Sequence, residues 1–155
     1  MHVMIKRAID LKQPDFSDVS NCTCAALRKA SRAITHSFDD ALRPFDLRAT
    51  QFTLLATMVK CGDVPLTQLA KALGMDRTTL TRNLKPLMRR QMVVIESDKD
   101  QRVRKVSLTD VGRQAFEHAL PHWQAVQETI SRKLGTERWA GLLDDLNTVV
   151  SLVED

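Results

Sequence analysis

One short stretch of this sequence, residues 77–90, concentrates hydrogen-bond donors and positive charge at helical spacing. Leu80, Leu84, Leu87 and Met88 recur as they would on the buried face of a helix. The other face carries Arg77, Thr78, Thr81, Arg82, Lys85 and Arg89, and no acidic residue interrupts the stretch. Arginine can donate two hydrogen bonds to guanine, and threonine offers a base its hydroxyl or its methyl group. The stretch therefore suits contact with DNA, although a merely solvated helix face would have the same composition.

A shorter helix precedes this one and is expected to hold it in place. Leu66, Leu69, Ala70 and Leu73 form its apolar stripe. Gly74 should end it, because glycine readily takes the left-handed conformation found at helix C-termini. Asp76 should cap the second helix, because its carboxylate can accept a hydrogen bond from an unpaired backbone amide. Two helices joined in this way are typical of a helix-turn-helix, whose second helix enters the major groove.

A β-hairpin is predicted directly after the second helix. The β-branched run Met92–Ile95 and the segment Val106–Leu108 enclose a polar stretch, which is typical of two short strands and a charged loop. From Lys71 to Lys105 there are ten lysines and arginines and four acidic residues, a balance of +6 in a chain of net charge +4. Positive charge concentrated on one segment is typical of a protein that binds nucleic-acid phosphates.

These segments together resemble the MarR family of dimeric winged-helix transcription regulators. The resemblance runs from about Asn21 to the C-terminus and is carried by LRATQFTLLATM, LTQLAKALGMDRTTLTRNLKPLMRRQMV and DKDQRVRKVSLTDVG. In the last segment, the family's Asp-x-Arg and Leu-Thr-x-x-Gly pattern stands as Asp100, Arg102, Leu108, Thr109 and Gly112.

The resemblance implies how the chain would contact DNA. The second helix would read the major groove through Arg77, Thr78, Thr79, Thr81 and Arg82, and Lys85 extends the same face. Arg102, in the hairpin loop, would enter the minor groove and be oriented by an ion pair with Asp100. Arg104 belongs to the same basic segment and is also expected to contact DNA.

The expected fold is mainly α with a small β-hairpin wing, a winged helix-turn-helix with N- and C-terminal dimerisation helices. We expect an N-terminal arm at 1–19, a dimerisation helix at 20–45, the DNA-binding domain at 46–109 and C-terminal dimerisation helices at 110–155. The last segment carries two apolar stripes, which include Trp123 and Trp139. They offer more apolar surface than a small winged domain can cover, which indicates a homodimer. A dimer would read an inverted-repeat, palindromic operator on double-stranded DNA.

Other classes of protein are disfavoured. No apolar run approaches the ~20 residues of a membrane span, and the N-terminus lacks the features of a signal peptide. With three cysteines and no export signal, we expect a cytoplasmic protein without a disulfide framework. No catalytic motif, cofactor site or metal site is expected, so the chain is not predicted to be an enzyme.

The signal to which such a regulator responds has two candidate sites. Arg32, His36 and Arg48 could bind a small anionic effector, such as the aromatic carboxylates that the family often binds, and a repressor released by that ligand is the main hypothesis. Residues Cys24–Arg32 also resemble the first helix of the family's hydroperoxide-sensing branch, so redox control through Cys24 is one alternative. That branch uses tyrosines, and this chain has none. A second alternative is a winged-helix module for protein assembly that does not bind DNA.

Overall fold

The computed structural model describes residues 22–97 and 104–153. The expected arm at 1–19 and the wing residues Asp100 and Arg102 lie outside the described residues. Contacts within the chain define two compact units, residues 1–34 and 35–155. The first helix therefore begins in one unit and ends in the other.

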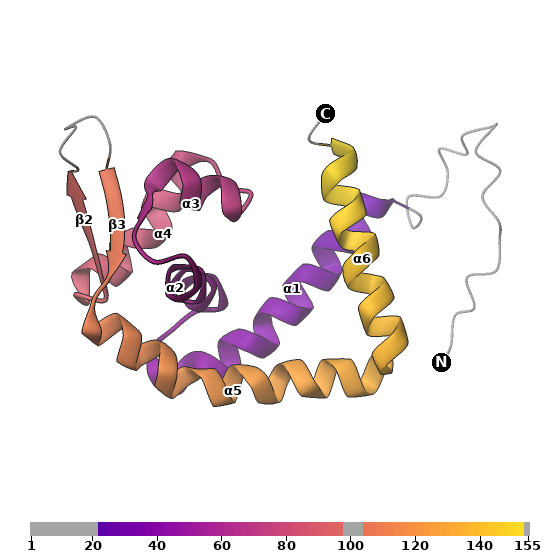
Figure 1. Cartoon of the computed structure of the whole chain (residues 1–155). Coiled ribbons are helices and arrows are strands. Elements are labelled where there is room, and N and C mark those ends of the chain that lie inside the picture. Colours follow the sequence, from indigo (N-terminus) through magenta and orange to yellow (C-terminus); the bar gives the residue numbers. More distant parts are fainter. Residues whose placement is uncertain (1–21, 98–103, 154–155) are drawn as a thin grey trace, which may run out of the picture. The chain divides into compact units, whose positions relative to one another are not determined.

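The described part of the chain is mostly helical and carries a small sheet (Figure 1), as the sequence predicts. The helices are α1 (Thr23–Leu42), α2 (Ala49–Cys61), α3 (Leu66–Ala72), α4 (Arg77–Arg89), α5 (Asp110–Leu134) and α6 (Thr136–Val153). A 3-10 turn, η2 (Arg43–Phe45), follows α1, and the strands are β1 (Val64–Pro65), β2 (Val93–Ser97) and β3 (Arg104–Leu108). The two helices predicted on either side of Gly74 and Asp76 are present as α3 and α4, whereas the sequence did not predict η2.

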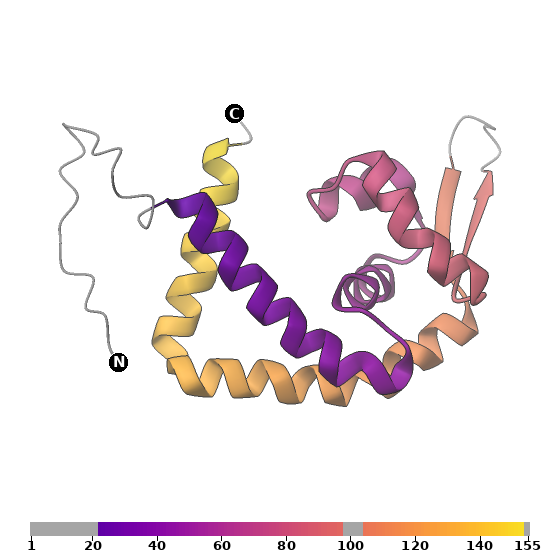
Figure 2. The ribbon, with the colours of Figure 1, turned by 180° about the vertical axis from the view of Figure 1, so that it is seen from behind.

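The sheet is antiparallel, with β3 between β1 and β2. Val106 lies at its centre, opposite Val64 on one side and Ile95 on the other. The two-residue strand β1, which precedes α3 directly, thus ties the start of the helix-turn-helix to the hairpin. Figure 2 shows α4 running diagonally from beside α3 down to the base of the hairpin of β2 and β3.

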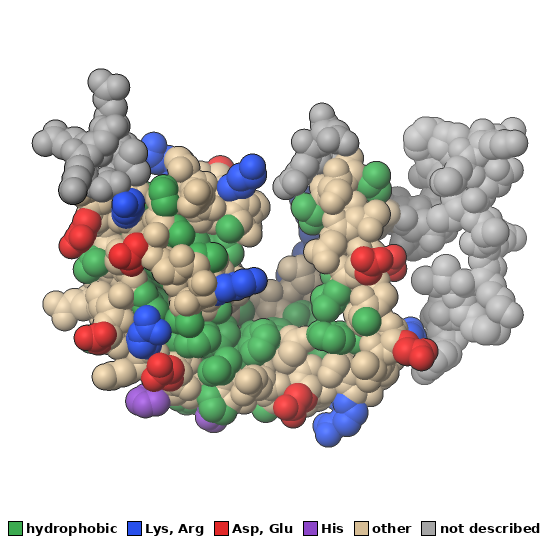
Figure 3. Space-filling view, viewed as in Figure 1, with side chains coloured by type: hydrophobic (Ala, Val, Ile, Leu, Met, Phe, Trp, Pro, Cys, Tyr) green, Lys and Arg blue, Asp and Glu red, His purple; other side chains and the backbone are tan. Residues whose placement is uncertain are grey.

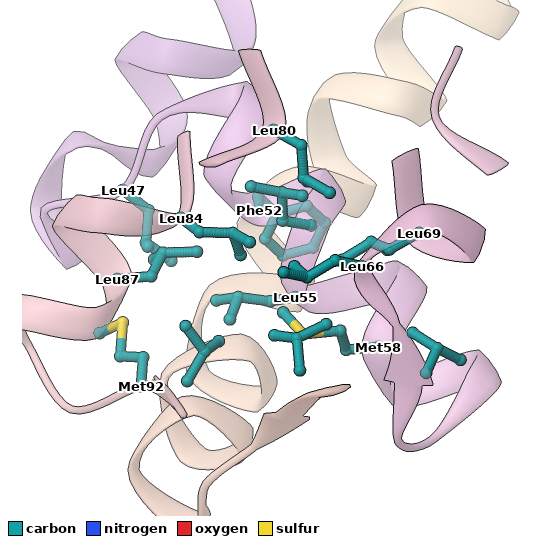
Figure 4. Packing of buried hydrophobic residues seen from close by; sticks show 14 of the residues in the cluster. Leu47, Phe52, Leu55, Met58, Leu66, Leu69, Leu80, Leu84, Leu87 and Met92 are labelled. Atoms are coloured by element: carbon teal, nitrogen blue, oxygen red, sulfur yellow. The ribbon is translucent and has the colours of Figure 1, made fainter. Parts of the chain in front are cut away.

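The core lies among α2, α3, α4 and the sheet (Figure 4). Leu80, Leu84 and Leu87 of α4 are fully buried, which confirms the predicted apolar face of this helix. The prediction for Met88 is wrong, because its side chain remains 38% exposed. Met88 is rotated about 100° around the helix axis from Leu87, so it lies at the edge of the leucine face and is covered only in part.

The first half of α5 packs on this core, whereas α6 does not. Phe52 of α2 stacks on Phe116 and on Trp123, with ring centroids 5.1 and 5.6 Å apart. Among the described residues of α6 none is buried, and Leu142, Leu143, Val150 and Leu152 are all more than 40% exposed. Figure 3 shows hydrophobic side chains open to solvent along α6. No helix in the described ranges is both long enough and apolar enough to cross a membrane.

Candidate nucleic-acid interface

The N-terminus of α4 is fixed by Asp76. Its carboxylate accepts hydrogen bonds from the backbone N–H of Thr79 at 2.8 Å and from the Thr79 hydroxyl at 2.6 Å. Both hydrogen bonds lower the pKa of Asp76 below its ordinary value, and the bond from the Thr79 hydroxyl has the larger effect. Thr79, which the resemblance assigns to DNA contact, therefore has its hydroxyl engaged in the helix cap.

The predicted reading face is one continuous surface. Arg77, Thr78, Thr81, Arg82 and Lys85 line a single shallow hollow on α4. Thr81 is half-buried and its hydroxyl donates to the Arg77 carbonyl at 2.8 Å, whereas the other four side chains are exposed. Within the described residues Arg77, Arg82 and Lys85 form no ion pair. This surface therefore presents three unpaired cations, which suits a polyanion.

The hairpin supplies a second basic position. Arg104 is exposed at the loop end of β3, where it pairs in register with Ser97 of β2. Asp100 and Arg102, which the resemblance assigns to the minor groove, belong to the loop between these strands and lie outside the described residues.

The C-terminus of α4 is held by contacts that the sequence did not predict. Gln91 takes a left-handed conformation with φ of 55°. The N–H of Gln91 bonds the Met88 carbonyl at 3.0 Å and the N–H of Met92 bonds the Leu87 carbonyl at 2.9 Å. This is a Schellman motif, which satisfies the last carbonyls of a helix. Next to it, the Arg90 guanidinium donates to the carbonyls of Phe45 and Asp46.

The residues that follow α4 are also held by the start of α5. The Thr109 hydroxyl donates to the carbonyls of Gln91 and Met92, and it accepts the backbone N–H of Gly112 at 3.1 Å. A Cβ at position 112 would lie 2.1 Å from the Met92 carbonyl oxygen, so only glycine fits there. The Thr-x-x-Gly pattern seen in the sequence thus joins the end of the helix-turn-helix to α5.

Of the three residues expected to bind an anion, the structure brings two together. His36 and Arg48 line a cavity of about 480 Å³, and Arg32 is not among its lining residues. Arg48 pairs with Asp39 at 3.1 Å, and His36 lies 3.6 Å from Asp40. An anion would therefore have to compete with these aspartates. Asp39 and Asp40 were missed because carboxylates at this spacing look like ordinary surface residues.

The cysteines are free and exposed. Cys24, the expected redox residue, is in the first turn of α1 and Cys22 directly precedes that helix. Cys61 ends α2 and lies in the wall of a separate surface hollow with Val64 and Leu69.

Comparison with known proteins points to one family. The model of the MarR family matches residues 47–103. The M. tuberculosis transcriptional regulator MosR, in a crystal structure with DNA, is 34% identical with a TM-score of 0.80, and the match covers 86% of this chain and 96% of that one. The HTH-type transcriptional regulator YhbI of Bacillus subtilis is 26% identical over 133 residues, which are 85% of this chain and 84% of that protein. Bordetella bronchiseptica BpsR has the same fold, with 23% identity, a TM-score of 0.74 and coverage of 82% and 97%.

Proposed function

Because this chain belongs to the MarR family of transcription regulators, we propose that it binds an inverted-repeat operator as a homodimer and represses transcription by competing with polymerase for the promoter. The observation that carries the proposal is the exposed face of α4, where Arg77, Arg82 and Lys85 stand without ion-pair partners in the described residues. Within this proposal the protein acts in the cytoplasm, where its operator would be.

The roles of the DNA-facing side chains follow from their positions on α4. Arg82, opposite the buried leucines, is placed to donate to a guanine edge, and Thr78 lies one turn nearer the N-terminus. Arg77, Thr81 and Lys85 flank them, and Thr79 contributes by holding the cap. We assign Arg104 and Lys85 to phosphates, and Arg102, oriented by Asp100, to the minor groove.

Dimerisation is supported by the exposed apolar side chains of α6. Leu142, Leu143 and Val150 lie on one face of this helix, at 42–53% exposure. A second copy would cover them, with segments 20–45 and 110–155 forming the interface. The two α4 helices would then reach half-sites about 34 Å apart on one side of the duplex.

For the signal, we propose a small anionic ligand bound near His36 and Arg48. The cavity of about 480 Å³ is large enough for a compact organic acid. BpsR, which shares the fold, is described as regulated in its DNA binding by 6-hydroxynicotinic acid. The ligand would release DNA only if it binds more tightly to a conformation in which the two α4 helices are wrongly spaced.

Oxidation of Cys24 is the second candidate signal, favoured by the exposure of this thiol. Peroxide would then release DNA from the wild type and not from Cys24→Ser. If a small ligand is the signal, that ligand would release DNA equally from wild type and from Cys24→Ser.

The test of the main proposal is binding to the DNA upstream of the protein's own gene, across a salt series. Wild type should bind with an affinity that falls steeply with salt. Arg82→Ala should lose about 1–3 kcal/mol of specific binding, because it removes a base contact. Lys60→Ala, which removes one positive charge from an exposed site at the end of α2, should bind as wild type. No salt-sensitive binding, or binding indifferent to Arg82, would favour the assembly module instead.

A further inference from the structure

The end of α4 is joined to the turn between α1 and α2 by one side chain. Arg90 donates to the Asp46 carbonyl and, 3.1 Å away, to the Phe45 carbonyl. The Asp46 carboxylate adds an ion pair at 3.5 Å. Two N–H groups of one planar guanidinium therefore hold two successive carbonyls, a geometry that a single ammonium group cannot reproduce.

The backbone on both sides of this contact is fixed. Asp46 has a left-handed conformation with φ of 53°, which ends η2, and its N–H bonds the Arg43 carbonyl at 2.9 Å. On the other side, the Schellman motif around Gln91 fixes the residue that follows Arg90. The guanidinium thus connects two rigid turns.

The segment that follows the Phe45–Asp46 turn is bound by a residue of α1. Asp39 of α1 accepts the backbone N–H of Ala49, the first residue of α2, at 2.7 Å, and pairs with Arg48 at 3.1 Å. Two groups of hydrogen bonds, joined by the short backbone segment 46–48, therefore connect the last turns of α1 and the start of α2 to the end of α4. All of these residues belong to the unit 35–155.

A small change in the tilt of α4 at Arg90 produces a large displacement of the N-terminal turn of this helix. From Arg77 to Arg90 the helix rises about 20 Å, at ~1.5 Å per residue. A tilt of roughly 10° at Arg90 would move the N-terminal turn by about 3.5 Å, which is close to the ~3.4 Å between successive bases of a strand. Thr78 and Arg82 would then face different bases.

We infer that Arg90 is a positioning residue for base recognition, which sets the angle of α4 through the Phe45–Asp46 turn without touching DNA. This inference rests on the proposed function. The Arg90 side chain is 31% exposed and its guanidinium is bound to the turn, whereas the neighbouring Arg89 is exposed and is free to approach a phosphate.

The experiment compares Arg90→Lys and Arg90→Met with Arg89→Ala in the full-length protein. The probes are the duplex that wild type enriches from a randomised pool and a shuffled duplex of the same base composition. Both Arg90 variants should lose roughly tenfold or more in affinity for the enriched duplex. Their affinity for the shuffled duplex should stay within about twofold, with an unchanged salt dependence, because no phosphate contact is lost. Arg89→Ala should instead weaken both complexes alike and reduce the salt dependence.

Each other result overturns the inference. Unchanged affinities for both duplexes would mean that Arg90 does not position α4. Equal losses on both duplexes would show a role in folding alone, and a reduced salt slope would show direct phosphate contact. Arg90→Lys keeps the aliphatic stem and the charge, so it carries the test if Arg90→Met does not fold. Wild-type protein that enriches no duplex would overturn the proposed function, and this inference with it.

Discussion

At the residue scale, two small hydrogen-bonding groups locate the two ends of α4. Asp76 caps its start through Thr79, and Thr109 binds the carbonyls at its exit while accepting from Gly112. Neither residue needs to touch DNA to matter for DNA binding. Each restricts where the reading face of α4 can lie.

Substitution of Gly112 tests the close approach at the exit. Gly112→Ala should destabilise the fold by about 1–3 kcal/mol, because the added Cβ would overlap the Met92 carbonyl. Gly141→Ala in α6 is the matched control, since nothing lies within 4 Å of the added Cβ. That change should stabilise by about 0.5–1 kcal/mol, as expected for glycine in a helix interior. Urea unfolding measures both, and equal effects would contradict the steric argument.

The cap predicts a pH dependence. Because the pKa of Asp76 is lower in the folded protein than its ordinary value of 3.8, ionised Asp76 stabilises the fold above that pH. That contribution is lost as the pH falls through the folded-state pKa. Asp76→Asn keeps a capping oxygen but does not titrate.

Urea unfolding of both proteins between neutral pH and pH 2 should therefore show wild type losing more stability than Asp76→Asn. Parallel curves would mean that the Thr79 hydrogen bonds do not favour the ionised carboxylate.

At the element scale, α4 combines a buried apolar face with an exposed basic one. The leucine face fixes the rotation of the helix about its axis, and this rotation presents Arg82 and Lys85 to solvent. Stability and the proposed base reading therefore depend on opposite sides of one helix and can be separated by mutation.

Leu84→Ala and Met88→Ala should separate the centre of the buried face from its edge. Leu84 is fully buried, so its truncation should cost about 2–5 kcal/mol. Met88 is 38% exposed, and its truncation should cost less than about 1 kcal/mol. Guanidinium unfolding gives both values, and a large loss at Met88 would show that it is covered in solution.

At the scale of the whole molecule, α6 exposes an apolar face that the rest of the unit 35–155 leaves uncovered. Leu143 and Val150 lie on this face at 42% and 53% exposure, and Thr148 lies on the opposite face. An exposed face of this kind indicates contact with another surface, which we propose to be a second copy.

Leu143→Arg should therefore shift the protein from dimer to monomer, because it would bury a charge in an apolar interface. Thr148→Arg adds the same group on the opposite face and should leave the dimer intact. Sedimentation velocity distinguishes the two states. A Leu143→Arg protein that remains dimeric would exclude this face of α6 from the interface.

The local sequence was enough to predict the helix-turn-helix, the cap at Asp76, and the grouping of Arg77, Arg82 and Lys85 on one face. These features depend on residues three or four positions apart, whose relative directions are set by the helix period. The family and the winged-helix class followed from the same local patterns. The DNA contacts assigned to these residues remain predictions.

Only the tertiary structure revealed the contact of Arg90 with Phe45 and Asp46, and the link from Asp39 to Ala49. Arg90 and Phe45 are 45 residues apart, and no spacing rule relates them. The exposure of Met88 and the need for glycine at position 112 likewise depend on which surfaces meet. Local periodicity determines which side of a helix faces inward, but the packing of the assembled elements decides which side chains are covered and which polar groups pair.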